Sequence, residues 1–169
     1  MHSTPQIAYL SLGSNLGDRE ANLKRGISAL DQPHVRPRRV SSLFETEPVG
    51  FRDQPWFLNL ALSVETRYSP DELMRRCLEI EIARGRKRCF QNGPRTLDID
   101  LLLYGDLIIH SSGLTLPHPR MAERRFVLEP LAEIAPEAYH PVLKRTVRSL
   151  LDSCGDPSSV RLYTRGKDA

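Results

Sequence analysis

The 169-residue chain has few cysteines, few aromatic side chains and no long apolar run. Its three cysteines, Cys77, Cys89 and Cys154, are odd in number and lack Cys-x-x-Cys spacing, which favours reduced thiols over a disulfide framework or zinc site. No stretch approaches the ~20 apolar residues that a membrane-spanning helix requires. The first residues also lack the basic and apolar regions of a secretory signal peptide. We therefore expect a cytoplasmic protein that does not associate with membranes.

The chain also lacks a large excess of charge of either sign. The chain has 24 Lys and Arg residues against 21 Asp and Glu residues, and the net charge of +3 does not by itself indicate a nucleic-acid partner. The length is sufficient for one domain with a substantial core. No repeat, low-complexity tract or linker divides the sequence, so we expect a single domain over residues 1–169.

The hydrophobic pattern predicts alternating strands and helices. Four apolar segments are predicted strands: residues 7–12, 40–45, 56–66 and 97–104. A helix is expected after Asp18, which can cap it, and is expected to end at Pro33 and Pro37. A second helix is expected after Ser69, because Ser-Pro-Asp-Glu combines an N-cap, a first-turn proline and a glutamate three residues after the serine. Gly85 can end this helix.

The resulting β-α-β-β-α-β order predicts a ferredoxin-like α/β (α+β) fold, an antiparallel sheet with helices packed on it. Helical segments interrupted by prolines are expected after this core. In the C-terminal extension, residues 149–169, the sequence Val-Arg-Leu-Tyr-Thr can form an extra strand. Because many unrelated functions share this fold, a function must be inferred from particular residues.

The segment GPRTLDIDLLLYG, residues 93–105, places two carboxylates in an otherwise apolar strand. Side chains alternate along a strand, so Asp98 and Asp100 point to the same face, roughly 7 Å apart. Like charges at this separation repel, so nearby cations or backbone donors are needed. Mg²⁺ prefers oxygen ligands and retains substrate phosphates in its coordination shell. The pair therefore favours a magnesium site.

A basic loop precedes this strand and contains five cations: Arg84, Arg86, Lys87, Arg88 and Arg95. In isolation such a run is typical of a solvated turn. Beside two carboxylates it favours a polyphosphate site, because arginine binds phosphate oxygens in a bidentate manner. His118, which lies between two prolines, can donate to a phosphate or form only a local hydrogen bond.

The loop TEPVGFRDQPWFLN combines aromatic residues with Asn59, a pattern that can hold a flat heterocycle. From this loop alone, the favoured interpretation is that Trp56 and Phe57 simply alternate between core and surface. The segment GSNLGD, residues 13–18, lacks the Lys-Ser/Thr of a phosphate-binding loop, so a tight strand-to-helix turn is favoured. Together these residues indicate a magnesium-dependent enzyme that acts on a polyphosphate and a flat ring.

Five segments in this order resemble the 6-hydroxymethyl-7,8-dihydropterin pyrophosphokinase family: YLSLGSNLGDRE, TEPVGFRDQPWFLN, IEIARGRKR, GPRTLDIDLLLYG and LPHPRMAERRFVLEPLAEIAPE. The similar region covers about residues 7–137. The resemblance implies a ferredoxin-like fold and transfer of pyrophosphate from ATP to the pterin hydroxymethyl group, yielding AMP in folate biosynthesis. It further implies an in-line displacement assisted by two Mg²⁺ ions, in a monomer acting on small molecules.

The resemblance also assigns residues to the site. It implies catalytic roles for Arg86, Arg88, Arg95, Asp98 and Asp100, of which the two aspartates hold Mg²⁺. It implies ATP binding by Glu81, Arg86, Arg88, Arg95, His118 and Arg124. It implies pterin binding by Thr46, Pro48, Val49, Phe57, Asn59 and Phe126, with the two phenylalanines on either face of the ring.

One position departs from the family pattern. Asn92 stands where many members have an aromatic residue, usually Trp, and the loop over residues 87–91 is slightly shorter. The resemblance implies that this loop closes over ATP; without the Trp, either closure is looser or Phe90 takes over the aromatic role. Two alternatives remain: a ferredoxin-like RNA-binding module that uses the basic loop, and a family member that binds nucleotide without activity.

Overall fold

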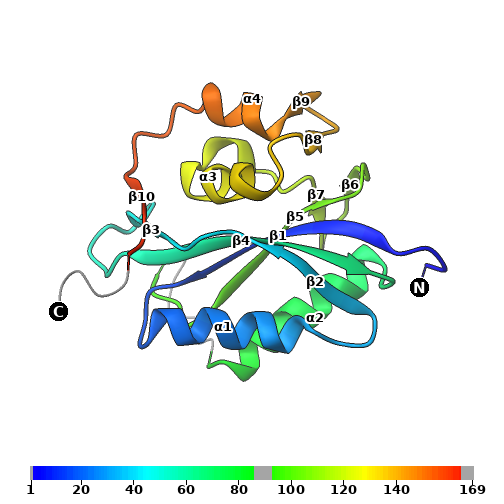
Figure 1. The fold of residues 1–169 in the computed structure, drawn as a ribbon, viewed down its shortest axis with the longest axis horizontal. Coiled ribbons are helices and arrows are strands. Elements are labelled where there is room, and N and C mark those ends of the chain that lie inside the picture. Colours follow the sequence, from blue (N-terminus) through cyan, green and yellow to red (C-terminus); the bar gives the residue numbers. More distant parts are fainter. Residues whose placement is uncertain (1, 86–92, 165–169) are drawn as a thin grey trace.

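An antiparallel sheet forms the centre of the molecule, and helices cover both of its faces (Figure 1). The structure is a computed structural model, and it describes residues 2–85 and 93–164. Three long strands lie side by side, in spatial order β4 (Phe57–Thr66), β1 (Gln6–Ser14) and β5 (Asp98–Tyr104), of which β5 is at the edge. On the outer side of β4 lie both β2 (Val35–Val40) and β3 (Phe44–Thr46). This order confirms the predicted ferredoxin-like fold.

Two helices cover one face of the sheet, the lower one in Figure 1: α1 (Arg19–Leu30) and α2 (Pro70–Ala83). The side chain of Asp18 accepts a hydrogen bond from the N–H of Ala21 at 3.1 Å and so caps α1. Ser69 caps α2 in the same way through the N–H of Glu72. Both predicted helix starts are therefore confirmed.

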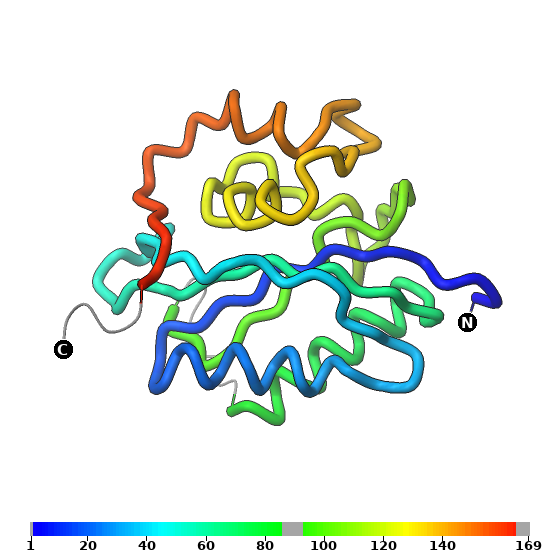
Figure 2. The backbone as a smooth tube through the Cα atoms, in the orientation of Figure 1, coloured from blue at the N-terminus to red at the C-terminus, as the bar shows by residue number. Residues whose placement is uncertain are grey.

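The other face is covered by α3 (Arg125–Ile134), which follows a 3₁₀ turn (Met121–Glu123), and α4 (Val147–Asp152) packs on α3. The described residues also form two short hairpins: β6 (Ile109–His110) with β7 (Thr115–Leu116), and β8 (Tyr139–His140) with β9 (Arg145–Thr146). After α4 the chain runs from the helical layer down to the sheet edge (Figure 2). There β10 (Val160–Leu162) pairs with β3, which confirms the predicted extra strand.

The predicted strand over residues 40–45 is wrong, because β2 ends at Val40 and β3 begins only at Phe44. The expected end of the first helix at Pro37 is also wrong, since Pro37 lies within β2. A proline cannot donate to the strand ladder, and the β2–β4 register shifts directly after it. Across the interruption, the Ser41 hydroxyl accepts from the N–H of Ala61, so a side chain replaces a backbone partner.

None of the described helices has the length and hydrophobicity that a membrane-spanning segment requires.

Candidate active site

Three neighbouring strands place site residues side by side at one end of the sheet. Gly13 of β1 pairs with Asn59 of β4 on one side and with Asp98 of β5 on the other. Two residues farther along each strand, Ser11 pairs with Asp100. Paired residues of an antiparallel sheet point to the same face, so these side chains share the face that α3 covers. Their neighbour Ile99 points to the opposite face of the sheet and packs in the core formed with α1 and α2.

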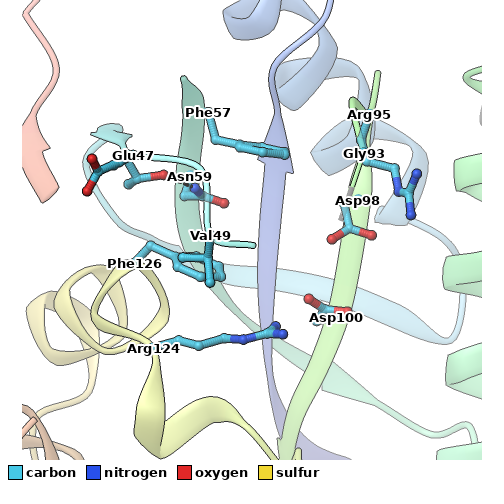
Figure 3. Close-up of a pocket in the computed structure, with 11 residues that line it drawn as sticks. Glu47, Val49, Phe57, Asn59, Gly93, Arg95, Asp98, Asp100, Arg124 and Phe126 are labelled. Atoms are coloured by element: carbon cyan, nitrogen blue, oxygen red, sulfur yellow. Dashed lines mark hydrogen bonds between the residues drawn. The ribbon is translucent and has the colours of Figure 1, made fainter. Parts of the chain in front are cut away.

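A pocket opens over this row (Figure 3). It is lined by Thr46, Glu47, Val49, Phe57, Asn59, Gly93, Arg95, Asp98, Asp100, Arg124 and Phe126. Apolar and amide side chains lie at one end together with Glu47, and Asp98, Asp100 and the guanidinium groups lie at the other. The pocket can therefore hold a ligand that is flat at one end and highly charged at the other.

The aromatic end is formed by Phe57 of β4 and Phe126 of α3, with Asn59 between them (Figure 3). Asn59 is 4% exposed, and its Nδ2 donates to the Thr46 hydroxyl at 2.6 Å. This hydrogen bond holds the amide in one orientation. The oxygen of that amide lies beside Gly13 and is available to a donor on a ligand edge.

At the charged end, the carboxylates of Asp98 and Asp100 lie near each other on β5, and the Arg124 side chain extends toward them (Figure 3). Arg95 lies beside Asp98. Its Nη1 atom is buried and has no hydrogen-bond partner within the described residues. Because a buried cationic donor without an acceptor is costly, this atom favours an anion in the pocket.

The two carboxylates on β5 suit Mg²⁺ better than a metal such as zinc that is bound mainly by protein ligands. Among the described residues, no group of three or more His, Cys, Asp or Glu side chains is placed to hold a metal. Two co-facial carboxylates leave most of a six-oxygen shell to water and phosphate, which is the arrangement that Mg²⁺ favours. Zinc would need more protein ligands.

Gly13 was not predicted, although it shapes the pocket. A Cβ atom at this position would lie 2.4 Å from Asn59 Oδ1 and 3.5 Å from Phe57 Cδ1. Only glycine therefore leaves room for the Asn59 amide at this height above β1. Glu47 and Gly93 also line the pocket without having been predicted. The signal for Gly13 lies in the strand register, which the sequence does not display.

Three predicted residues do not line this pocket: Pro48, Glu81 and His118. Glu81 is 2% exposed and lies behind β5, where its Oε1 accepts from the N–H of Ile99 at 3.0 Å. Burial, followed by the charges of Arg124 and Arg120, lowers the pKa of His118 to about 4. Its Nδ1 accepts from the N–H of Arg120, so the neutral ring carries its proton on Nε2.

Arg86 and Arg88, predicted to bind phosphate, lie outside the described residues, as do Phe90 and Asn92.

A family model described as 7,8-dihydro-6-hydroxymethylpterin-pyrophosphokinase (HPPK) matches residues 9–136. A 2-amino-4-hydroxy-6-hydroxymethyldihydropteridine pyrophosphokinase of Bacillus subtilis is 49% identical over 129 residues, which are 76% of this chain and 77% of the relative. The protein of the same name from Methylorubrum extorquens is 44% identical over 154 residues, covering 90% and 96% of the two chains. The folic acid synthesis protein fol1 of Schizosaccharomyces pombe is 42% identical over 161 residues.

Some relatives are much longer proteins. The alignment with the fission yeast protein covers 94% of this chain and only 22% of that relative. A crystal structure of wild-type Plasmodium falciparum HPPK-DHPS superposes with a TM-score of 0.71 and covers 88% of this chain and 43% of that one. At 18% identity this similarity shows the shared fold. With the family model matched over residues 9–136, and with the relatives above, this chain belongs to the 7,8-dihydro-6-hydroxymethylpterin-pyrophosphokinase family.

Proposed function

We propose that this chain transfers the terminal diphosphate of ATP to the hydroxymethyl group of 6-hydroxymethyl-7,8-dihydropterin, releasing AMP. The observation that carries the proposal is one pocket with an aromatic, amide-bearing end and a carboxylate- and arginine-bearing end. A pterin is a flat ring with hydrogen-bonding edges, and ATP brings a polyphosphate. Family membership supports the same reaction.

At the aromatic end, Phe57 and Phe126 would contact the two faces of the pterin. Asn59 Oδ1 would accept a hydrogen bond from the ring edge. The hydrogen bond from Asn59 Nδ2 to Thr46 holds the amide in the orientation that this requires. Val49 would complete the apolar wall, and we place Pro48 next to it in the chain, behind that wall. This arrangement directs the hydroxymethyl group toward the charged end.

At the charged end, Asp98 and Asp100 would hold two Mg²⁺ ions, and Arg95 and Arg124 would bind phosphate oxygens. Bound Mg²⁺ would supply positive charge and a fixed geometry to those oxygens. The buried Nη1 of Arg95 would gain a phosphate acceptor. We place Arg86 and Arg88 with the same phosphates and Glu81 behind them. His118, neutral at pH 7, would donate from Nε2.

In the reaction, the pterin hydroxyl oxygen bonds to the β-phosphorus and loses its proton. The bond from the β-phosphorus to the bridging oxygen of the α-phosphate breaks, and AMP leaves with that oxygen. The residues above hold the two substrates in line and offset the charge that develops on the phosphoryl oxygens. Positioning and charge stabilisation therefore supply most of the rate.

The test is AMP formation from MgATP with and without the pterin, with AMP and ADP quantified separately by chromatography. We expect pterin-dependent AMP and no ADP from the wild-type protein. Asp98→Asn should lower the rate about 100-fold or more, because it removes charge at the metal site. The exposed Asp106→Asn change, just beyond β5, is the matched control and should have no effect.

Formation of ADP, or of AMP without pterin, would contradict the proposal. ATP binding with no AMP would identify a family member that has lost activity. Binding of RNA in place of either substrate would favour the RNA-binding alternative.

A further inference from the structure

Asn15 directly follows β1 and is 2% exposed. It lies where three segments of the chain meet. Its backbone N–H donates to the carbonyl of Arg95 at 3.0 Å, and its Oδ1 accepts from the N–H of Arg95 at 2.8 Å. Its Nδ2 donates to Gln54 Oε1 at 2.9 Å and to the carbonyl of Pro55 at 2.8 Å. Every polar atom of the side chain is therefore used.

The first pair of bonds fixes the segment that enters β5. Arg95 is held through both its N–H and its carbonyl, so its backbone is tied to the end of β1. The Arg95 side chain lines the charged end of the pocket, and Asp98 follows three residues later. Asn15 thus fixes the position of the Arg95 backbone from which the side chain extends into the pocket.

The second pair of bonds fixes the segment that enters β4. Pro55 lies two residues before Phe57, whose ring forms one wall of the aromatic end. Between them, the carbonyl of Trp56 accepts from Arg19 Nη1 at 2.9 Å. The Asn15 amide is therefore a direct connection between the segment that positions Phe57 and the segment that positions Arg95.

We propose that Asn15 is a positioning residue that holds the ring end and the phosphate end of the pocket at one fixed separation. This inference rests on the proposed function, in which a substrate at each end must meet at reacting distance. In such a reaction, a small displacement of either substrate lowers the rate strongly. An amide is required because the position needs both an acceptor for Arg95 and donors for Gln54 and Pro55.

Two substitutions separate the two connections. Asn15→Asp keeps an acceptor for the N–H of Arg95 but loses both donors and turns a carboxylate oxygen toward the Pro55 carbonyl. Asn15→Ala loses every side-chain bond. The matched control is Asn22→Ala, because buried Asn22 supports the same turn through Ser14 Oγ and the Leu16 carbonyl and bonds to neither segment.

Trp56 supplies a readout that needs no substrate. It is the one tryptophan of the chain, so its fluorescence reports on the segment between Pro55 and Phe57. We expect Asn15→Asp to shift the Trp56 emission of the free protein. The same change should raise the Kd for pterin on the order of tenfold, the factor that one or two neutral hydrogen bonds supply. The Kd for a non-hydrolysable MgATP analogue should change less than about twofold.

Asn15→Ala should raise both dissociation constants, and Asn22→Ala should lower stability while leaving emission and both constants unchanged. Unchanged emission and pterin Kd in Asn15→Asp would overturn the inference. Equal shifts in Asn22→Ala would also overturn it, because they would reveal a general loss of order. Wild-type protein that releases no AMP would contradict the proposed function alone, since the emission of the free protein still tests Asn15.

Discussion

The smallest residue of the site imposes one of its strictest limits. Gly13 sits between Asn59 and Asp98 in the sheet, and a methyl group there would meet Asn59 Oδ1 at 2.4 Å. The amide cannot easily retreat, because it is buried and hydrogen-bonded to Thr46. Space at this position therefore decides how Asn59 faces a ligand.

Gly13→Ala should displace the Asn59 amide and break its bond to Thr46. We expect a loss of about 1–3 kcal/mol in the free energy of unfolding and a weaker affinity for pterin. Gly113→Ala is the control, since among the described residues no atom beyond its chain neighbours lies within 4 Å of a Cβ there. Urea unfolding and pterin titration measure both effects. Wild-type values for Gly13→Ala would show that Asn59 adjusts freely.

His118 gives the molecule a pH dependence with a defined sign. Burial first, then Arg124 and Arg120, lowers its pKa from 6.5 to about 4. Between these pH values the unfolded chain binds a proton that the folded chain does not, so stability falls as pH falls. The contribution is complete above about pH 6.5, is lost by about pH 4, and amounts to at most roughly 3 kcal/mol.

His118→Gln should therefore flatten the fall in stability between pH 6.5 and pH 4, measured as urea midpoints across that range. Burial also lowers the pKa of His140, so some slope of the same sign should persist in the variant. Coincident pH profiles for the wild-type protein and the variant would contradict a depressed pKa at His118.

At the scale of elements, α2 supports the strand that carries the aspartates. β5 is an edge strand, paired only with β1 in the main sheet of the described residues. The buried Glu81 of α2 accepts the N–H of Ile99, which lies between Asp98 and Asp100. A side chain thus takes the place of a neighbouring strand.

Glu81→Gln keeps an acceptor oxygen for the N–H of Ile99. Glu81→Leu removes that acceptor and leaves the buried N–H without this hydrogen bond. We expect Glu81→Leu to be the less stable of the two variants by about 1–3 kcal/mol. Its affinity for Mn²⁺, used as a probe for Mg²⁺, should also be the lower one. Urea unfolding and Mn²⁺ titration compare the pair. Equal stabilities would show that this hydrogen bond does not support β5.

The elements with local signals were predictable from sequence. Ser69, Pro70 and Glu72 mark the start of α2, and Asp18 marks that of α1, because capping uses residues close in the chain. The break between β2 and β3 was not predictable. It depends on hydroxyl groups of Ser41 and Ser63 that bond to residues on neighbouring strands.

The same division applies to the site. Asp98 and Asp100 were proposed from their spacing in a strand, and Phe57 and Asn59 from the family resemblance, and all four line the pocket. Gly13 and Asn15 stand in the motif GSNLGD, but their contacts lie on β4 and in the segments before β4 and β5. Only the register of the folded sheet brings these partners together, so no spacing in the sequence could indicate them.

On the scale of the whole molecule, the C-terminal segment lies outside the region that the family model matches and supports elements that line the pocket. β10 extends the sheet beyond β3, which carries Thr46. Asp156 accepts the N–H of Arg125, where α3 begins and no side chain of its own N-cap residue caps it. Both the strand and the cap adjoin elements that line the pocket.

Truncation after Cys154 should therefore lower the unfolding free energy by about 2 kcal/mol or more, because several hydrogen bonds and a helix cap are lost. Affinity for pterin should fall with it. Asp156→Ala removes the cap and the hydrogen bond from the N–H of Ser158 but keeps β10, and it should cost about 1 kcal/mol. Thermal unfolding compares the three proteins, and a truncated chain as stable as the full one would contradict a structural role for β10.

The central claim is that a single pocket holds a flat ring at one end and a metal-bound polyphosphate at the other. The most direct measurement is a crystal structure with 6-hydroxymethyl-7,8-dihydropterin, a non-hydrolysable ATP analogue and Mg²⁺. We predict the ring between Phe57 and Phe126, metal density at Asp98 and Asp100, and the hydroxymethyl oxygen facing the β-phosphorus. A ring bound elsewhere, or phosphates distant from the two aspartates, would contradict the account.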